Sequence, residues 1–225
     1  IPEMRYTYTY VSPSSLLNPI RWEITLTEAG NVVALYDMIG GKKWNDKDKT
    51  MFKNPYSQFV KLETDFTKSW TLDGQSKLVG HVNAGIIYPY GNSDWVPNSE
   101  LFYVGGANSI RAFSVRGVGP GSFAGVGDKA HDYMLRNGEI KFVCNLEYRR
   151  QLFGNLHGAI FLDAGNVWNS KSNDEDSELQ TNYSNAKFRF NRFFRELAVG
   201  TGVGLRYDLD FLILRLDWGL ALHVP

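Results

Sequence analysis

Eight segments of this 225-residue chain alternate apolar and polar residues with a period of two, as in a β-strand whose two faces meet different surroundings. They lie at about residues 3–11, 20–28, 58–72, 76–88, 139–152, 157–168, 196–208 and 211–223. Most exceed the roughly five or six residues of a strand in a soluble protein and approach the roughly 9–11 that a tilted strand needs to cross hydrocarbon. The pattern predicts an all-β chain.

The two faces of these segments separate apolar from charged side chains. In the last segment Leu216 and Trp218 fall on one face, whereas Arg215 and Asp217 fall on the other. A soluble β-sandwich would turn its charged face to water, and a membrane barrel would turn its apolar face to lipid and its polar face to the lumen. The alternation by itself fits both architectures.

The connections between the segments differ in length. Tight turns are expected at residues 73–75, 153–156 and 209–210, and long links at about 29–57, 89–138 and 169–195. Short turns on one rim and long loops on the other are typical of an outer-membrane barrel, whereas compact soluble domains rarely have several structureless links beyond about 15 residues. We therefore predict an antiparallel transmembrane β-barrel of about eight strands, one domain over residues 1–225.

Two of the long links contain polar stretches. Residues 40–56 and 169–187 carry charges of both signs, which predicts solvated external loops. A short helix is expected within residues 32–39, before the first of these stretches.

The composition argues against several functions. The 24 Lys and Arg residues balance 24 Asp and Glu residues, so the basic excess of a nucleic-acid-binding protein is absent and no such partner is expected. Cys144 is the single cysteine and the four histidines are scattered, so neither a metal site nor a cofactor is predicted. Because no nucleophile motif is present, we predict no catalytic residues and no enzymatic activity.

The longest link contains an unusual stretch at residues 105–117, which is rich in glycine, apolar and basic. Such a stretch suits the inside of a barrel better than water. An arginine that is brought into the barrel interior needs carboxylate partners for its guanidinium group. Alternation turns two such groups inward, those of Glu147 and Asp163 in the segments that follow. We expect Arg111 to fold back and pair with one or both acids, although an exposed arginine with two unrelated acids fits the spacing equally well.

Three motifs resemble the BamA/TamA family of outer-membrane assembly barrels. That family has a Val-Arg-Gly-Phe or Tyr signature in a Gly-Gly-x-x-Ser context, and here residues 105–113 end in Ile-Arg-Ala-Phe. Residues 161–168 are similar to the family's Phe-x-Asp-x-Gly-Asn-Val-Trp strand, and residues 145–149 are similar to the strand before it. The motifs occur in the family's order over about residues 100–223.

The resemblance implies a sixteen-stranded barrel whose sixth external loop enters the lumen and is held there by the signature arginine. The residues of this lumen-loop lock would be Gly105, Gly106, Ile110, Arg111 and Phe113, with Asp163 and Glu147 as acidic partners of the arginine and Phe113 as a packing anchor. The signature glycine is replaced by Ala112, which suits the TamA-like branch and leaves the turn geometry open.

The resemblance also implies how much of such a barrel is present. The eight segments would correspond to strands eight to fifteen. The first seven strands, the periplasmic POTRA domains and the closing strand are then expected to lie outside this chain, which would reside in a bacterial outer membrane.

The function implied by the resemblance is physical rather than chemical. A weakly paired strand edge would template the insertion of client β-barrel proteins, and the expected partners are outer-membrane lipid, these clients, and periplasmic or lipoprotein accessory subunits. Alternatives are a transporter like those of two-partner secretion, a passive outer-membrane porin and, outside the family, a soluble β-sandwich.

Overall fold

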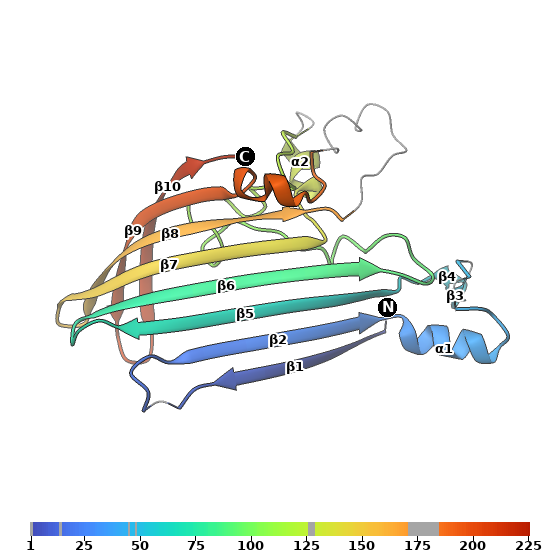
Figure 1. The fold of residues 1–225 in the computed structure, drawn as a ribbon, viewed down its shortest axis with the longest axis horizontal. Helices are drawn as coiled ribbons and strands as arrows, with labels where there is room; N and C mark the ends of the chain where they lie inside the picture. The colour runs from blue at the N-terminus through green and yellow to red at the C-terminus, as the bar shows by residue number, and fades with distance from the viewer. Residues whose placement is uncertain (1, 14, 45, 48, 126–128, 171–184) are drawn as a thin grey trace.

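The computed structural model describes residues 2–13, 15–44, 46–47, 49–125, 129–170 and 185–225. Eight antiparallel strands form one curved sheet in the order of the chain (Figure 1). They are β1 (Glu3–Val11), β2 (Ile20–Ala29), β5 (Phe59–Thr71), β6 (Ser76–Pro89), β7 (Ile140–Phe153), β8 (Leu156–Trp168), β9 (Ala198–Asp208) and β10 (Ile213–His223). Every predicted strand is confirmed, and the predicted ends agree to within two residues.

Shorter elements occupy the long links. The predicted helix is confirmed as α1 (Asn31–Ile39), which extends beyond the end of β2 (Figure 1). Four others were not predicted: the two-residue strands β3 (Thr50–Met51) and β4 (Asn54–Pro55), the helix α2 (Lys129–Leu135) and the 3-10 helix η1 (Phe190–Arg195). Each is too short to produce a recognisable period. None of the helices in the described ranges is long and apolar enough to cross a membrane.

The polar stretch at residues 40–56 differs in part from the predicted solvated loop. Besides the β3–β4 hairpin it contains Lys49, which is buried and whose Nζ donates to the carbonyl of Trp44 (2.6 Å). A buried ammonium needs such acceptors, and alternating charges in the sequence do not reveal them. Most of the second polar stretch, residues 171–184, lies outside the described residues.

The connections alternate as predicted. The turns after β5, β7 and β9 lie at one end of the sheet, and the three long links begin and end at the other (Figure 1). Gly154 and Asp210 have φ of 51° and 67°, which is the left-handed geometry of tight hairpin turns. The last turn is longer than predicted, since Leu209 N donates to the carbonyl of Leu212 (2.9 Å) and β10 begins only at Ile213.

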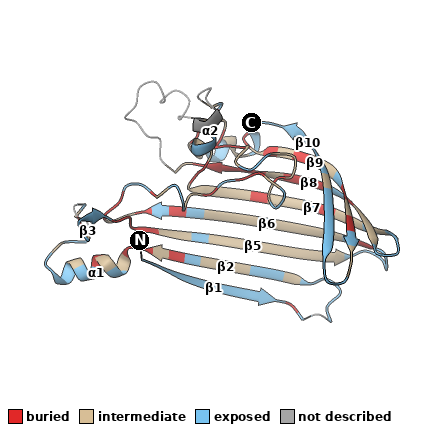
Figure 2. Cartoon of the chain, turned by 180° about the vertical axis from the view of Figure 1, so that it is seen from behind, coloured by how far each residue is buried: buried red, intermediate tan, exposed pale blue. Residues whose placement is uncertain are grey.

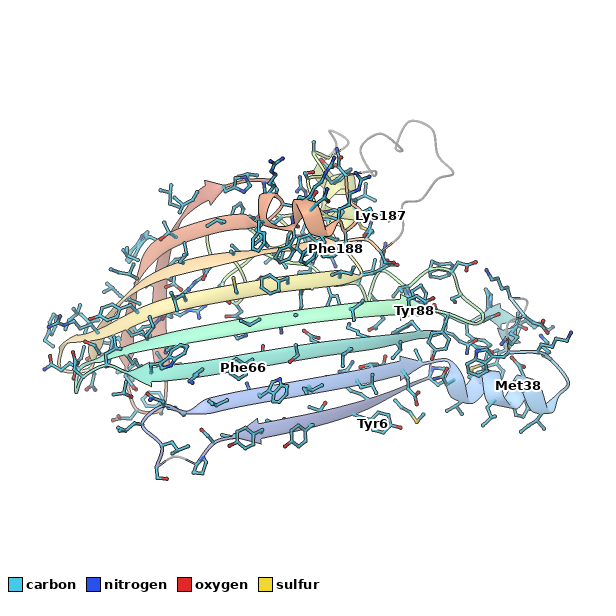
Figure 3. The ribbon with its side chains drawn as sticks, viewed as in Figure 1. Tyr6, Met38, Phe66, Tyr88, Lys187 and Phe188 are labelled. Atoms are coloured by element: carbon cyan, nitrogen blue, oxygen red, sulfur yellow. The ribbon has the colours of Figure 1, made fainter. Side chains whose placement is uncertain are left out.

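The register keeps the two faces of the sheet distinct. One cross-strand row joins Tyr10, Trp22, Phe66, Val82 and Cys144 on the convex face. The adjacent row joins Thr9, Glu23, Asp65 and Asn83 on the concave face. The labelled Tyr6, Phe66 and Tyr88 all appear on the convex side (Figure 3). The convex face is therefore apolar, and the concave face is polar.

The hydrophobic core lies between the concave face and the link between β6 and β7, which is called the lumen loop below (residues 90–139). Seen from the concave side, this loop passes in front of the sheet near β7 to β9 (Figure 2). Its Phe102, Val104 and Ile110 are buried against wall residues such as Val143 and Val167. The loop thus fills part of the hollow that the curved sheet encloses.

The sheet is open at β1 and β10. Each pairs with a single neighbour, β2 or β9, among the strands the structure describes. The first and last of the eight strands therefore lie at opposite edges of the sheet.

Candidate functional site

The lumen loop contains a compact turn that presents one arginine to the wall. Gly106 N donates to the carbonyl of Phe113 (2.8 Å), and Phe113 N donates to that of Ile110 (3.1 Å). Gly105 has a φ of 102°, and a Cβ there would lie 2.0 Å from the carbonyl oxygen of Ser114. Only glycine satisfies this geometry, so Gly105 allows the chain to reverse and place Arg111 toward the wall.

Arg111 binds Asp163 of β8 in a bidentate manner. Its Nε and Nη2 donate to Oδ2 (2.8 Å) and Oδ1 (2.7 Å) of the carboxylate, and its backbone N–H donates to Oδ2 (3.0 Å). The arginine side chain is 7% exposed, and that of Asp163 is fully buried. Paired charges at this depth require matched geometry, and the planar guanidinium fork supplies it.

Two further groups complete the surroundings of the guanidinium. Its Nη1 donates to Glu147 of β7, and its Cζ lies 3.6 Å above the ring centroid of Phe161. The negative face of an aromatic ring attracts a cation. The arginine is therefore held by two carboxylates and one ring, which come from two neighbouring strands.

These partners keep Arg111 charged. Burial opposes the charged form, but hydrogen bonds and charge attraction from Asp163 and Glu147 outweigh it, so the pKa of Arg111 is raised. The guanidinium of Arg111 therefore stays protonated at physiological pH, and a pH change in that range would not release the loop.

Glu147 also links the arginine to the edge strand. It contacts Arg149 Nε (2.6 Å) and Arg206 Nη2 (3.3 Å), and Arg206 Nη1 contacts Asp217 of β10 (2.6 Å). Arg215 of the same strand donates to the carbonyl of Ala107 in the lumen loop (2.6 Å). A continuous set of charges therefore connects β7, β8, β9 and β10 with the loop.

A polar row extends from the site in the opposite direction. Asn145 Nδ2 donates to the carbonyl of Ser109 (2.7 Å) and to Asp163 Oδ1 (2.8 Å). Its Oδ1 faces His81 Nδ1 (2.8 Å), and His81 Nε2 faces Asp65 Oδ2 (2.8 Å). Asn145 therefore contacts both the loop and the carboxylate that holds Arg111.

The structure brings the seven predicted site residues into one region. Arg111 contacts both predicted acids, Ile110 is fully buried in the core, and Phe113 packs against that core. The glycines at 105 and 106 adopt left-handed φ values of 102° and 89° within the turn.

Sequence reasoning missed several members of the site, namely Asn145, His81, Asp65, Phe161, Arg206 and Asp217. The alternation turns each of these side chains toward the concave face, and this inward orientation is the sequence feature by which they could have been identified. Their pairing depends on the cross-strand register, such as Asn145 opposite Asp163, and the sequence alone does not give that register.

The site has the properties of a docking contact. The residues that the structure describes contain no group of three or more metal-binding side chains. Its charges are paired with one another, and they fix a loop against the inner wall. An apolar convex face, a polar concave face and a loop held inside define the class as a transmembrane β-barrel with an internal loop.

Comparison with known proteins gives the family. Residues 48–225 match the Omp85 superfamily domain, and the chain belongs to this superfamily. Membership places it in an outer membrane, among barrels without enzymatic activity that generally take part in protein assembly or translocation. The soluble sandwich is thereby excluded.

The fold is also similar to a solved structure, that of BamA from Haemophilus ducreyi lacking POTRA domains 1–3. The TM-score is 0.58 at 15% sequence identity, and the match covers 98% of this chain and 52% of that one. The chain therefore spans about half the length of that BamA chain and matches part of its sixteen-stranded barrel.

Proposed function

We propose that this chain is part of a factor that inserts client β-barrel proteins into the outer membrane, with Arg111 as the residue that locks the lumen loop. The observation that carries the proposal is the buried bidentate contact between Arg111 and Asp163. Superfamily membership supports the assembly role, since these barrels generally serve assembly or translocation.

The lock would act by joining the loop to the barrel wall. Arg111 reaches β7 and β8, and Arg215 ties β10 to the loop carbonyl of Ala107. A loop held at three strands would fix their relative positions. The unpaired edge of the assembled barrel would then keep a constant shape, to which a client strand adds by backbone hydrogen bonds.

We further propose that the eight strands form half of a sixteen-stranded barrel of the TamA-like branch. The open sheet and the match to half of the BamA chain support the first point. Ala112 in place of the signature glycine supports the second. Client barrels, accessory periplasmic or lipoprotein subunits and membrane lipid would be the partners.

The assembly proposal is tested by reconstitution of the full-length protein in lipid vesicles. Folding of an added client barrel, measured by its heat-dependent electrophoretic mobility, is compared for Arg111→Ala, Arg111→Lys and the unsubstituted protein. We expect both variants to slow client folding, since lysine cannot form the bidentate contact. Unchanged client folding with Arg111→Ala would contradict the proposed lock, and no acceleration by the unsubstituted protein would contradict the assembly role.

Translocation of a dedicated protein substrate is the second candidate function. The buried lumen loop favours it over a passive porin, because the loop occupies space through which solutes would pass. Secretion of one cognate substrate without client insertion would support the transporter. A large, stable single-channel conductance that is unaffected by Arg111→Ala would instead support the porin.

A further inference from the structure

One segment of the chain has a composition that the lumen-loop lock does not explain. Residues 187–195 read Lys-Phe-Arg-Phe-Asn-Arg-Phe-Phe-Arg, with four basic residues, four phenylalanines and no acid. The whole chain has zero net charge, so this is a strong local excess. We call residues 187–195 the outer basic segment.

The outer basic segment lies on the convex face of the sheet, at the end where the long links are found. Phe193 packs edge-on against Phe142 of β7, with ring centroids 5.3 Å apart, and in a tilted arrangement against Trp168 of β8, with ring centroids 5.4 Å apart. Phe188 also packs edge-on against Trp168, at 5.4 Å. The labelled Lys187 and Phe188 lie by this end of β8 (Figure 3). The segment is thus fastened to the face that meets the membrane.

Most of the remaining side chains of the segment are exposed, and Arg192 is half-buried. Phe190 and Phe194 are 83% and 80% exposed, which is unusual for phenylalanine unless a nonaqueous medium covers it. Arg189 and Arg195 are also exposed, and within the described ranges neither forms an ion pair. Arg192 donates to the amide oxygen of Asn185 (3.3 Å).

The acid that follows the segment does not neutralise it. Glu196 is buried, and its Oε2 accepts a hydrogen bond from Trp168 Nε1 (2.7 Å). Its carboxylate is therefore directed toward the barrel wall, while the exposed arginines face outward from the neighbouring turn.

We propose that the outer basic segment binds the phosphate groups of membrane lipids in the leaflet at the long-link end of the barrel. Phe190 and Phe194 would insert among the acyl chains next to the headgroups, where aromatic side chains anchor membrane proteins. Arg189, Arg192 and Arg195 would bind lipid phosphates, whose oxygens match the guanidinium fork. The membrane is the occupant because the segment is fastened to the lipid-facing wall and its positive charge complements phosphate.

The proposal extends beyond client insertion and does not depend on Arg111. It is tested with full-length protein in phosphatidylcholine vesicles that contain spin-labelled phosphatidylglycerol or spin-labelled phosphatidylcholine. The fraction of label immobilised at the protein surface gives the relative affinity for the anionic lipid. We expect a preference for phosphatidylglycerol, of roughly fivefold for each arginine that engages a phosphate, and a decrease of this preference in high salt.

The decisive comparison uses the triple variant Arg189→Gln, Arg192→Gln, Arg195→Gln. The anionic preference should fall to near one, whereas the matched control Lys77→Gln, on the lumen face at the opposite end, should retain it. Phe190→Ser with Phe194→Ser should weaken immobilisation of both labels. Absence of a preference in the unsubstituted protein, or a triple variant with the full preference, would overturn the proposal. Heat-dependent mobility verifies that every variant is folded, and client insertion is measured separately.

Discussion

The Cβ of Ala112 lies so near the backbone of Gly200 in β9 that a Cβ built on Gly200 would be 2.5 Å from it. On the neighbouring strand a Cβ on Gly219 would be 2.8 Å from the Cα of Ala112. Two glycines in the wall therefore make room for the loop next to the contact between Arg111 and Asp163. Close backbone approach and charge pairing act together at this point.

Gly200→Ala is expected to displace the loop, because the added methyl group would clash with Ala112. Limited trypsin cleavage at Arg116 of the folded protein should become faster. Gly158→Ala is the control, since its nearest neighbour is the flexible side chain of Leu152 at 3.3 Å. Equal cleavage rates in the two variants would show that the wall glycines do not accommodate the loop.

Arg111→Ala is expected to destabilise the barrel by about 3–5 kcal/mol, because it leaves buried carboxylates without their partner. The double variant Arg111→Ala, Asp163→Ala should lose less free energy of unfolding than the sum of the losses in the two single variants. Urea unfolding in lipid vesicles measures both. Arg5→Ala is the control, since its contact with Glu3 is largely exposed and contributes at most about 1 kcal/mol. Additive losses would argue against a direct pair.

Asn145→Leu is expected to loosen the loop, because it removes the donor to Ser109 and Asp163 while it preserves side-chain size. An unsatisfied buried acceptor costs about 1–3 kcal/mol. His81→Leu should have a smaller effect, since His81 hydrogen-bonds to Asn145 and Asp65 and, among the described residues, to none of the loop. Urea unfolding provides the comparison, and a larger effect at His81 would contradict this order.

Arg206→Met is expected to loosen the edge strand, because Arg206 bridges Glu147 and Asp217 of β10. Hydrogen exchange of β10 amides should accelerate, while exchange in the central strand β6 should stay unchanged. Uniform acceleration across all strands would indicate global destabilisation instead of a local link to the edge.

The strands were predictable because every one of them separates two environments, as in Leu216 and Trp218 opposite Arg215 and Asp217. Because each strand must be apolar on one face and polar on the other, its residues alternate in the sequence, and this alternation predicts the strand. Alternation also turns Glu147 and Asp163 inward, and each lies within one of the motifs that resemble the family, but the spacing alone left their pairing with Arg111 open. Distances along the chain, however, do not reveal the lateral neighbours of a strand.

The unpredicted parts depend on cross-strand register and on packing. Asn145 contacts Asp163 because β7 and β8 align these two residues. The outer basic segment reaches the wall through Phe193, which packs on Phe142 some fifty positions earlier in the chain. A short aromatic and basic stretch has no regular period, so the sequence does not predict this contact. Such contacts arise from the assembled sheet, so they require coordinates.

The most direct test of the lock measures where the lumen loop lies in the full-length protein. Spin labels are placed at Asn108→Cys in the loop and Asp73→Cys in the turn after β5, in a Cys144→Ala background. Pulsed electron resonance then gives their distance distribution in lipid. We predict one narrow distance, broadened by Arg111→Ala and broadened no further when Asp163→Ala is added. An unchanged narrow distribution in Arg111→Ala would contradict the claim that Arg111 holds the loop.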